Sequence, residues 1–365
     1  MSAPMSAQSP AIDSPAIGAA YARTRRFALA AAAGGLALAA FGWWLDPPLF
    51  FQAWLLAFLL WTGLAVGCLT LLLAGHLLSH PRLEPVLDEL EAGALTLPLL
   101  ALLGLPLLAG LPDLYRWAET GTGPMGPVRG HWLDQGGFVL RSAVYLGVWC
   151  ALAWAMTRPG HHHRRTAAVG LLLMLPTVTL AGLDWVMSLD PDWLSSLFGL
   201  AYGVTQTVAA LAVALLAAEL RPDRALPQRA GGMAGALLAL VGTTAYLWFV
   251  HFLVVWAANL PEEAGWYLDR GGAWLWLMPG IVVPATALAV LILLPRWLRS
   301  HRLALLTAGG LLLAQHLAHM VWLVRPAAQR PELHWLDAVV AAALGALCLA
   351  LFAHRLSGTP TRRTS

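Results

Sequence analysis

Ten apolar segments of about 20 residues recur along the chain, and no other feature of the sequence limits its fold as strongly. A helix needs about 20 consecutive apolar residues to cross a hydrocarbon core of roughly 30 Å. The segments lie at 27–45, 50–77, 91–111, 137–157, 166–187, 193–219, 232–257, 273–294, 303–324 and 334–354. Because lipid offers the backbone no hydrogen-bond partners, each segment is predicted to be helical. The predicted fold class is therefore all-α, a polytopic membrane protein with ten transmembrane helices.

The composition excludes a soluble domain, because 59% of the residues are hydrophobic, 11% are charged and the mean hydropathy is +0.68. Residues 27–355 are predicted to form one transmembrane domain. Residues 1–26, of which 1–22 are small, polar and proline-containing, are predicted to be a disordered cytoplasmic tail, and residues 356–365 a second cytoplasmic tail.

All 22 basic residues are arginine, and their placement predicts the orientation of the chain. With the N-terminus in the cytoplasm, 16 arginines lie on the cytoplasmic side, 5 lie on the other side, and Arg141 lies within a span. This bias follows the positive-inside rule, so both termini are predicted to be cytoplasmic in a multi-pass protein. The net charge of +3 then reflects topology and gives no indication of nucleic-acid binding.

The segment AGLDWVMSLDPDWLSSLFG, residues 181–199, places carboxylates at the junction of two apolar spans. An ionised carboxylate inside a span costs roughly 2.5 to 3.5 kcal/mol, so Asp184 is predicted to face protein or water. Asp190 follows in the turn between Trp185 and Trp193, which is typical of a segment that leaves the membrane through an aromatic belt.

Arg141 is the one arginine within a span, and two interpretations remain open for it. Its charge either pairs with Asp184 or Asp134, or extends to the nearby membrane surface. Glu262 and Glu263 lie at a second junction on the same predicted side. They either end helices in a solvated loop or hold a proton and take part in proton uptake and release.

Four histidines lie within or at the ends of spans: His76, His251, His316 and His319. Bis-histidine haem ligation needs opposed imidazoles, and the i,i+3 pair His316 and His319 lies on one helix face. Interhelical hydrogen bonding or a proton path is therefore the favoured interpretation. Cys68, Cys150 and Cys348 lack paired spacing and are predicted to pack as small hydrophobic residues, with no metal site.

Two long motifs carry a family resemblance: DWVMSLDPDWLSSLFG, residues 184–199, and FLVVWAANLPEEAGWYLDR, residues 252–270. Together with the exit WLVRP at 322–326, they resemble the ActF-type subunit of alternative complex III. That subunit is the second quinone-binding subunit of a quinol:cytochrome c oxidoreductase, within the NrfD-like group of membrane subunits.

The resemblance implies two four-helix bundles and two further helices, in a bacterial cytoplasmic (inner) membrane. It implies a sister NrfD-like subunit and iron–sulfur and multihaem c-type cytochrome partners. Haem and clusters would belong to those partners, while a quinone or quinol could contact this chain. His251 stands where the family is expected to have glutamine, which adds a titratable group.

The resulting hypothesis is a respiratory quinol oxidoreductase subunit without a redox centre, not catalytic alone, which contributes quinone-site walls, a proton path or scaffolding. Asp184, His251, Glu262 and Glu263, with Arg141, are predicted to line a polar track that opens on the periplasmic side. The alternatives are a secondary transporter and a haem-b membrane cytochrome. Secondary candidate residues are Asp190, His76, His316 and His319.

Overall fold

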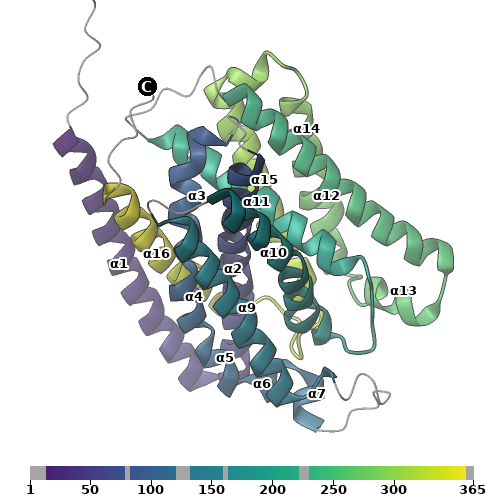
Figure 1. Cartoon of the computed structure of the whole chain (residues 1–365). Helices are drawn as coiled ribbons and strands as arrows, with labels where there is room; N and C mark the ends of the chain where they lie inside the picture. Colours follow the sequence, from purple (N-terminus) through teal and green to yellow (C-terminus); the bar gives the residue numbers. More distant parts are fainter. Residues whose placement is uncertain (1–13, 79–82, 121–131, 159–162, 222–229, 359–365) are drawn as a thin grey trace, which may run out of the picture.

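The computed structural model describes residues 14–78, 83–120, 132–158, 163–221 and 230–358. Within these ranges the chain forms helices and no β-strand. Ten of the described helical segments are long and apolar enough to cross a membrane, and they run roughly alongside one another (Figure 1). The prediction of an all-α polytopic membrane protein with ten spans is confirmed.

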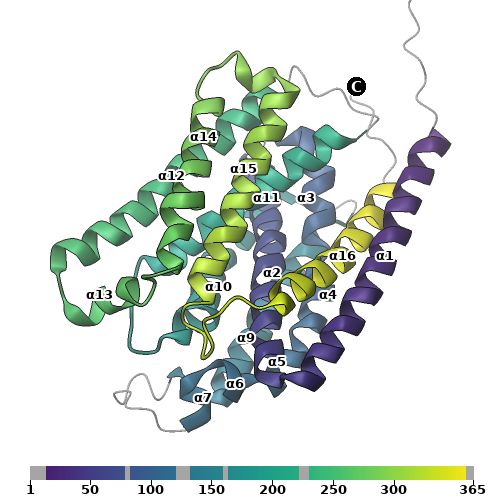
Figure 2. The same cartoon turned by 180° about the vertical axis from the view of Figure 1, so that it is seen from behind.

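Eight of the ten spans form two four-helix bundles that meet along α2 and α11. The first bundle combines the interrupted third span with α2 (Pro47–Leu78), α9 (Gln135–Met156) and α10 (His163–Trp185). The second consists of α11 (Phe198–Leu220), α12 (Ala230–Ala258), α14 (Val283–Leu293) and α15 (Arg302–Val324). The two remaining helices, α1 (Ser14–Leu45) and α16 (Trp335–Gly358), pack against each other on one flank (Figure 2). This is the arrangement that the family resemblance implied.

The helix α1 begins earlier than expected, so the predicted disordered tail is wrong for residues 14–26. Alanine-rich sequence favours helix, and Pro15 fits the first turn, where its missing N–H is not needed. The helix therefore extends past the apolar segment. The remaining residues of the two predicted tails, 1–13 and 359–365, lie outside the described residues.

The third span is broken into short helices by proline and glycine. After η1 (Glu84–Val86) come α3 (Leu87–Ala94), α4 (Leu97–Leu103), α5 (Leu105–Ala109) and α6 (Leu111–Leu114), followed by α7 (Arg116–Thr120). Pro98, Pro106 and Pro112 each stand in the first turn of a helix, where no N–H is needed. At one break, Trp54 of α2 donates its indole N–H to the carbonyl of Leu103 at 2.7 Å. A neighbouring helix thus satisfies a backbone group that lipid could not.

Close packing of α2 against α11 depends on two glycines one turn apart. A Cβ atom on Gly63 would lie 2.1 Å from the side-chain oxygen of Gln206, and one on Gly67 would lie 2.3 Å from the backbone oxygen of Gln206. Small residues at this spacing let membrane helices approach closely. The helix α2 is apolar on all sides and accordingly lies inside the protein.

The segments between the later spans carry the second sequence motif. The helix α12 ends where Asn259 adopts φ 50°, a left-handed conformation that asparagine tolerates at helix ends. The helix α13 (Pro261–Leu268) follows. The eighth span then starts with η3 (Trp274–Trp276) and one π-helical turn, η4 (Met278–Val282), before α14. Pro279 and Pro284 remove backbone donors there, which explains the irregular turn.

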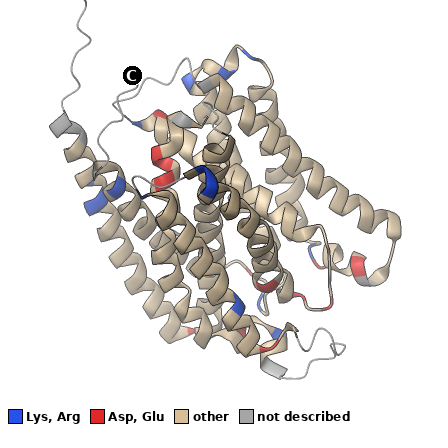
Figure 3. Ribbon diagram, in the orientation of Figure 1, with Lys and Arg blue, Asp and Glu red and all other residues tan. Residues whose placement is uncertain are grey.

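Charged residues gather toward the two ends of the bundle, and the spans between them are largely uncharged (Figure 3). The end that carries the start of α1 and the end of α16 is called the terminal end below. The opposite end carries α7, α13 and the C-terminal turn of α10 (Figure 1). Both acidic motifs therefore lie at the opposite end, as the spacing of the spans predicted.

Candidate functional site

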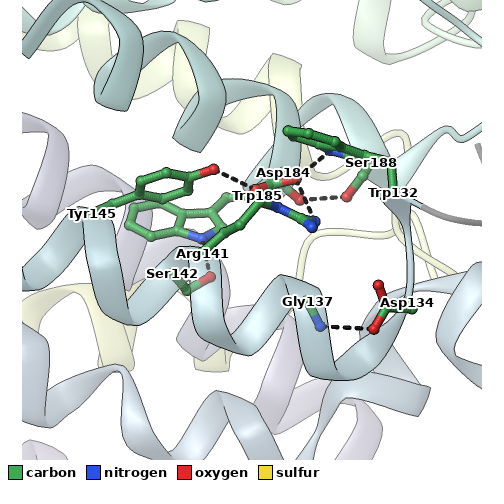
Figure 4. Close-up of polar contacts among 9 residues, drawn as sticks. All are labelled: Trp132, Asp134, Gly137, Arg141, Ser142, Tyr145, Asp184, Trp185 and Ser188. Carbon is green, nitrogen blue, oxygen red and sulfur yellow. Dashed lines mark hydrogen bonds and ion pairs between the residues drawn. The ribbon is translucent and has the colours of Figure 1, made fainter.

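The last turn of α10 places Asp184 against α9, with its side chain fully buried. Arg141 and Tyr145 lie four residues apart on α9, so both side chains project from the same face of that helix. Figure 4 shows both of them, together with Trp132, directed at the Asp184 carboxylate. The prediction that Asp184 faces protein rather than lipid is confirmed.

Four hydrogen bonds satisfy the Asp184 carboxylate. Arg141 donates Nε–H to Oδ2 at 2.9 Å and Nη2–H to Oδ1 at 3.0 Å, a bidentate ion pair. The Tyr145 hydroxyl donates to Oδ2 at 2.8 Å, and the Trp132 indole donates to Oδ1 at 2.9 Å. Each oxygen thus accepts two hydrogen bonds, which compensates the hydration that the charge loses on burial. We call Asp184, Arg141, Tyr145 and Trp132 the Asp184 cluster.

Of the two carboxylates proposed as partners for Arg141, Asp184 is the one that it contacts. Asp134 instead accepts a hydrogen bond from the backbone N–H of Gly137 at 2.7 Å and caps the N-terminus of α9. The guanidinium of Arg141 also lies 4.3 Å from the ring centroid of Trp132, within cation–π range. Pairing with Asp184 therefore replaces the alternative in which Arg141 extends to the membrane surface.

A second layer of hydrogen bonds fixes the end of α10 to its neighbours. The Trp185 indole donates to the Ser142 hydroxyl at 2.9 Å, which ties α10 to α9. The Tyr115 hydroxyl donates to the carbonyl of Trp185 at 3.0 Å, and the Ser188 hydroxyl donates to the carbonyl of Asp184. The ion pair is thus held by contacts from three separate segments of the chain.

An apolar cavity of about 110 Å³ lies between α2, α4–α6, α9 and α10 and is lined in part by residues of this second layer. Its walls include Phe58, Tyr115, Phe138 and Ser142. Pockets that enclose a whole small molecule usually measure roughly 300 to 1,000 Å³. The cavity therefore has room for part of an apolar ligand and not for a complete one.

His251 occupies a second site in α12, where aromatic rings enclose it. Its Nδ1 atom lies 2.6 Å from the hydroxyl of Tyr267, at hydrogen-bonding distance. The ring centroids of Trp193 and Trp248 lie 5.3 and 5.4 Å from that of His251. Trp193 in turn stacks on Trp266 with centroids 4.4 Å apart. Tyr267 and Trp266 come from α13, so the second sequence motif, residues 252–270, helps to enclose the histidine that directly precedes it.

His316 and His319 point inward from α15, and each is only 1% exposed. Neither imidazole forms a hydrogen bond with the part of the chain that the structure describes. Within the same ranges, Nε2 of His251 and Oε1 of Gln206 also lack partners. Trp248 packs edge-on against His319 with ring centroids 4.7 Å apart and so joins His319 to His251. We call Gln206, Trp248, His251, His316 and His319 the histidine cluster.

Arg270 lies buried beside this cluster, although the sequence indicated only a loop charge there. It donates to the carbonyls of Trp266, Trp322 and Leu323 at 2.7, 3.2 and 3.1 Å, and thereby caps the C-terminus of α15. Its guanidinium lies 3.6 Å from the ring centroid of Trp266. Burial lowers the pKa of Arg270 to about 9, so the group stays charged at neutral pH.

Arg325, within the WLVRP exit of the ninth span, is a second buried arginine that the sequence indicated only as a loop charge. It donates Nη1–H to the side-chain oxygen of Gln52 at 3.0 Å, and its Nε lies 3.4 Å from a carboxylate oxygen of Asp337. It joins α2, α15 and α16. In the sequence, Arg270 and Arg325 each stand alone among tryptophans and aliphatic residues. That pattern could have indicated that both arginines are buried.

The three acidic candidates at the opposite end differ in their surroundings. Asp190 is half-buried, and burial raises the pKa of its carboxyl group although the nearby Arg270 opposes that shift. Glu263 is half-buried in the first turn of α13. Glu262 belongs to the same turn, but its side chain lies outside the described residues.

His76 lies at the terminal end of α2, far along the helix from the histidine cluster. Its Nδ1 atom is 2.9 Å from the carbonyl oxygen of Leu72, and its ring centroid lies 5.2 Å from that of His163. The sequence grouped His76 with the other histidines only by residue type. The fold places it at the other end of the bundle.

The proposed site residues therefore form two groups. No hydrogen bond, ion pair or ring contact joins Asp184 or Arg141 directly to His251 within the described ranges. Tyr145 and Trp132 were missed as partners of Asp184, although the i,i+4 spacing of Arg141 and Tyr145 could have indicated one of them.

The fold defines the class of the protein: an all-α multi-pass membrane protein with two four-helix bundles. No group of three or more His, Cys, Asp or Glu side chains in the described segments is arranged to hold a metal ion. A comparison with protein-family models finds no match, and a search of the curated proteins finds none either.

Proposed function

We propose that this chain is a membrane subunit of a respiratory quinol:electron-acceptor oxidoreductase of the alternative complex III type. In this proposal it carries no redox centre, lies in the bacterial inner membrane and conducts protons through the histidine cluster. A sister NrfD-like subunit and iron–sulfur and multihaem c-type subunits would supply the electron path. The two long motifs at 184–199 and 252–270 are the sequence support.

The observation that carries the proton-conducting role is the set of unpaired buried polar atoms. Both ring nitrogens of His316 and His319, one nitrogen of His251 and the side-chain oxygen of Gln206 have no partner within the described part of the chain. An unsatisfied buried polar group costs about 1 to 3 kcal/mol. Water molecules remove that cost where a site offers several polar partners. Imidazoles linked by water can accept a proton at one nitrogen and release one at the other.

The positions of these groups support a path inward from the opposite end of the bundle. A helix rises about 1.5 Å per residue, so His319 lies roughly 7 Å and His316 roughly 12 Å below the end of α15 at Val324. His251 is hydrogen-bonded to Tyr267 of α13, which lies beyond the span. The path therefore leads from α13 toward the middle of the membrane, where Gln206 contacts α2.

The Asp184 cluster has a different part in this proposal. Both carboxylate oxygens already accept two hydrogen bonds, so protonation would disrupt a complete ion pair. Its proposed role is to brace α10 against α9, the two helices that supply Trp185 and Ser142 to the lining of the apolar cavity. The volume of that cavity argues for contact with part of a quinone tail rather than a complete quinone site.

The two alternatives fit the geometry less well. A haem held by His251 and His319 would have to displace Trp248, whose ring contacts both imidazoles. A secondary transporter built from repeats should have interrupted helices at corresponding positions in its halves. In this protein the interrupted span of the first bundle is its second span, and that of the second bundle is its third span. The two interruptions therefore do not lie at corresponding positions.

The test uses the complex that co-purifies with the chain in mild detergent, which should contain c-type haem and iron–sulfur proteins. His316→Gln and His319→Gln variants keep hydrogen bonding but cannot titrate. In proteoliposomes they should slow quinol-dependent proton release by on the order of 10²-fold, the scale of a positioned proton-transfer group. His76→Gln is the matched control at the other end. If the His316→Gln and His319→Gln variants assemble normally and keep full quinol oxidation and proton release, the histidine cluster does not conduct protons.

A further inference from the structure

A groove of about 530 Å³ opens at the terminal end of the bundle, between the end of α2 and the start of α10. It is lined by Leu77 of α2 and by His163, Arg164, Arg165 and Ala168 of α10. Its volume lies within the roughly 300 to 1,000 Å³ that is usual for small-molecule sites. The proton path proposed above does not involve this groove.

Within the described residues, the two arginines of the groove are not committed to hydrogen bonds or ion pairs. Both side chains are exposed, and neither forms a hydrogen bond or ion pair with the part of the chain that the structure describes. Other arginines at this end are engaged: Arg221 pairs with Glu89 at 2.8 Å, and Arg302 donates to the carbonyl of Glu219 at 3.0 Å. Arg164 and Arg165 therefore present two adjacent positive charges to a ligand.

Leu77 and Ala168 supply the apolar part of the groove lining, at the level where two spans end. Leu77 is in the last turn of α2, and Ala168 is one turn into the span formed by α10. His163 also lines the groove, and its ring centroid lies 5.2 Å from that of His76. The groove thus combines two cationic side chains with apolar side chains from the ends of two membrane-spanning helices.

We propose that this groove binds one anionic phospholipid, with its phosphate diester between Arg164 and Arg165 and an acyl chain along Leu77 and Ala168. Basic pockets between transmembrane helices bind anionic lipid headgroups in this way. Free inorganic phosphate shares the anion chemistry but has nothing to place against the apolar wall. The apolar wall is the reason for assigning a lipid.

The experiment titrates the purified full chain in detergent micelles with phosphatidylglycerol or phosphatidylcholine and counts retained lipids by native mass spectrometry. One phosphatidylglycerol per chain should bind saturably, and phosphatidylcholine should not. The Arg164→Gln/Arg165→Gln double variant should bind phosphatidylglycerol about 30-fold more weakly, from the contribution of two arginines near a membrane surface. The control, Arg23→Gln/Arg26→Gln, removes the same charge from exposed positions on α1 at the same end and should bind as the parent does.

A second pair of variants separates a shaped site from diffuse attraction. Ala168→Trp keeps both arginines but fills the groove, so retention should fall, while Val169→Trp at a neighbouring exposed position outside the groove lining should change nothing. The proposal would be overturned if the Arg164→Gln/Arg165→Gln and Arg23→Gln/Arg26→Gln variants lost phosphatidylglycerol binding equally. Full binding of phosphatidylglycerol by Ala168→Trp would also overturn it. So would inorganic phosphate that competes at the same concentration as the lipid, because the ligand would then be a free anion.

Discussion

The ion pair of the Asp184 cluster predicts an asymmetry between its two partners. Arg141→Gln leaves a carboxylate that is completely buried, with only Tyr145 and Trp132 as donors. Removing one partner of a buried pair costs about 3 to 5 kcal/mol. Because the Arg141 side chain is 19% exposed, we expect the lower limit, about 3 kcal/mol of unfolding free energy.

Asp184→Asn leaves Arg141 without its ion-pair partner, and the consequence differs from that of Arg141→Gln. The Arg141 side chain is partly exposed and long enough to reach water, so its charge is not stranded. The asparagine also keeps one oxygen as an acceptor. We expect a loss of about 1.5 kcal/mol, the lower value for a hydrogen bond to a charged group. The double variant should be less destabilised than the sum of the two single variants, with a coupling of at least about 1 kcal/mol.

The assay is reversible unfolding in mixed micelles with increasing dodecyl sulfate, followed by circular dichroism. The control is Arg330→Gln, which removes a more exposed pair, Arg330 with Asp46, and should change stability by less than about 1 kcal/mol. A larger loss for Asp184→Asn than for Arg141→Gln would refute the reasoning, as would additive losses in the double variant.

Two further predictions concern a titrating loop residue and the contact between the bundles. Burial raises the folded-state pKa of Asp190 above the unfolded value of about 3.9. The protonated carboxyl group therefore contributes to stability below about pH 3.9, and this contribution is lost as the pH rises through the folded-state pKa. Unfolding free energies of the parent and Asp190→Asn, measured from pH 3 to 7, should therefore diverge in this direction, and a pH-independent difference would contradict it. Gly67→Ala would place a methyl group 2.3 Å from the backbone oxygen of Gln206 and should cost roughly 1 to 3 kcal/mol in the same unfolding assay. Gly147→Ala, which meets nothing within 4 Å, should be neutral or stabilising, and equal effects of the two changes would show that the close approach of α2 and α11 does not matter.

The Asp184 cluster and the histidine cluster differ in how many of their buried polar atoms form hydrogen bonds with the protein. Their proposed roles rest on this difference. The Asp184 carboxylate receives four donors, an arrangement that holds helices in one position. The imidazoles of His316 and His319 receive none from the described part of the chain. A fully paired group resists a change of protonation, whereas an unpaired buried group depends on water or on a transferred proton.

The sequence alone determined the class of the protein, because the length and apolarity of a membrane-spanning helix are set by the bilayer and not by its neighbours. Ten spans and the burial of Asp184 away from lipid were therefore predictable. The start of α1 at Ser14 was not, since alanine-rich helix continues beyond the apolar segment that marks a span.

The tertiary structure decided which polar residues meet. Asp184 and Arg141 are 43 positions apart in the chain and pair because α9 and α10 are neighbours. In the other bundle, His251 of α12 contacts Tyr267 of α13, and Trp248 of the same helix contacts His319 of α15. Arg270 and Arg325 looked like loop charges until the helix ends that they contact were in place. Periodicity and hydropathy describe each helix against lipid, whereas contacts between polar groups depend on how helices pack against one another.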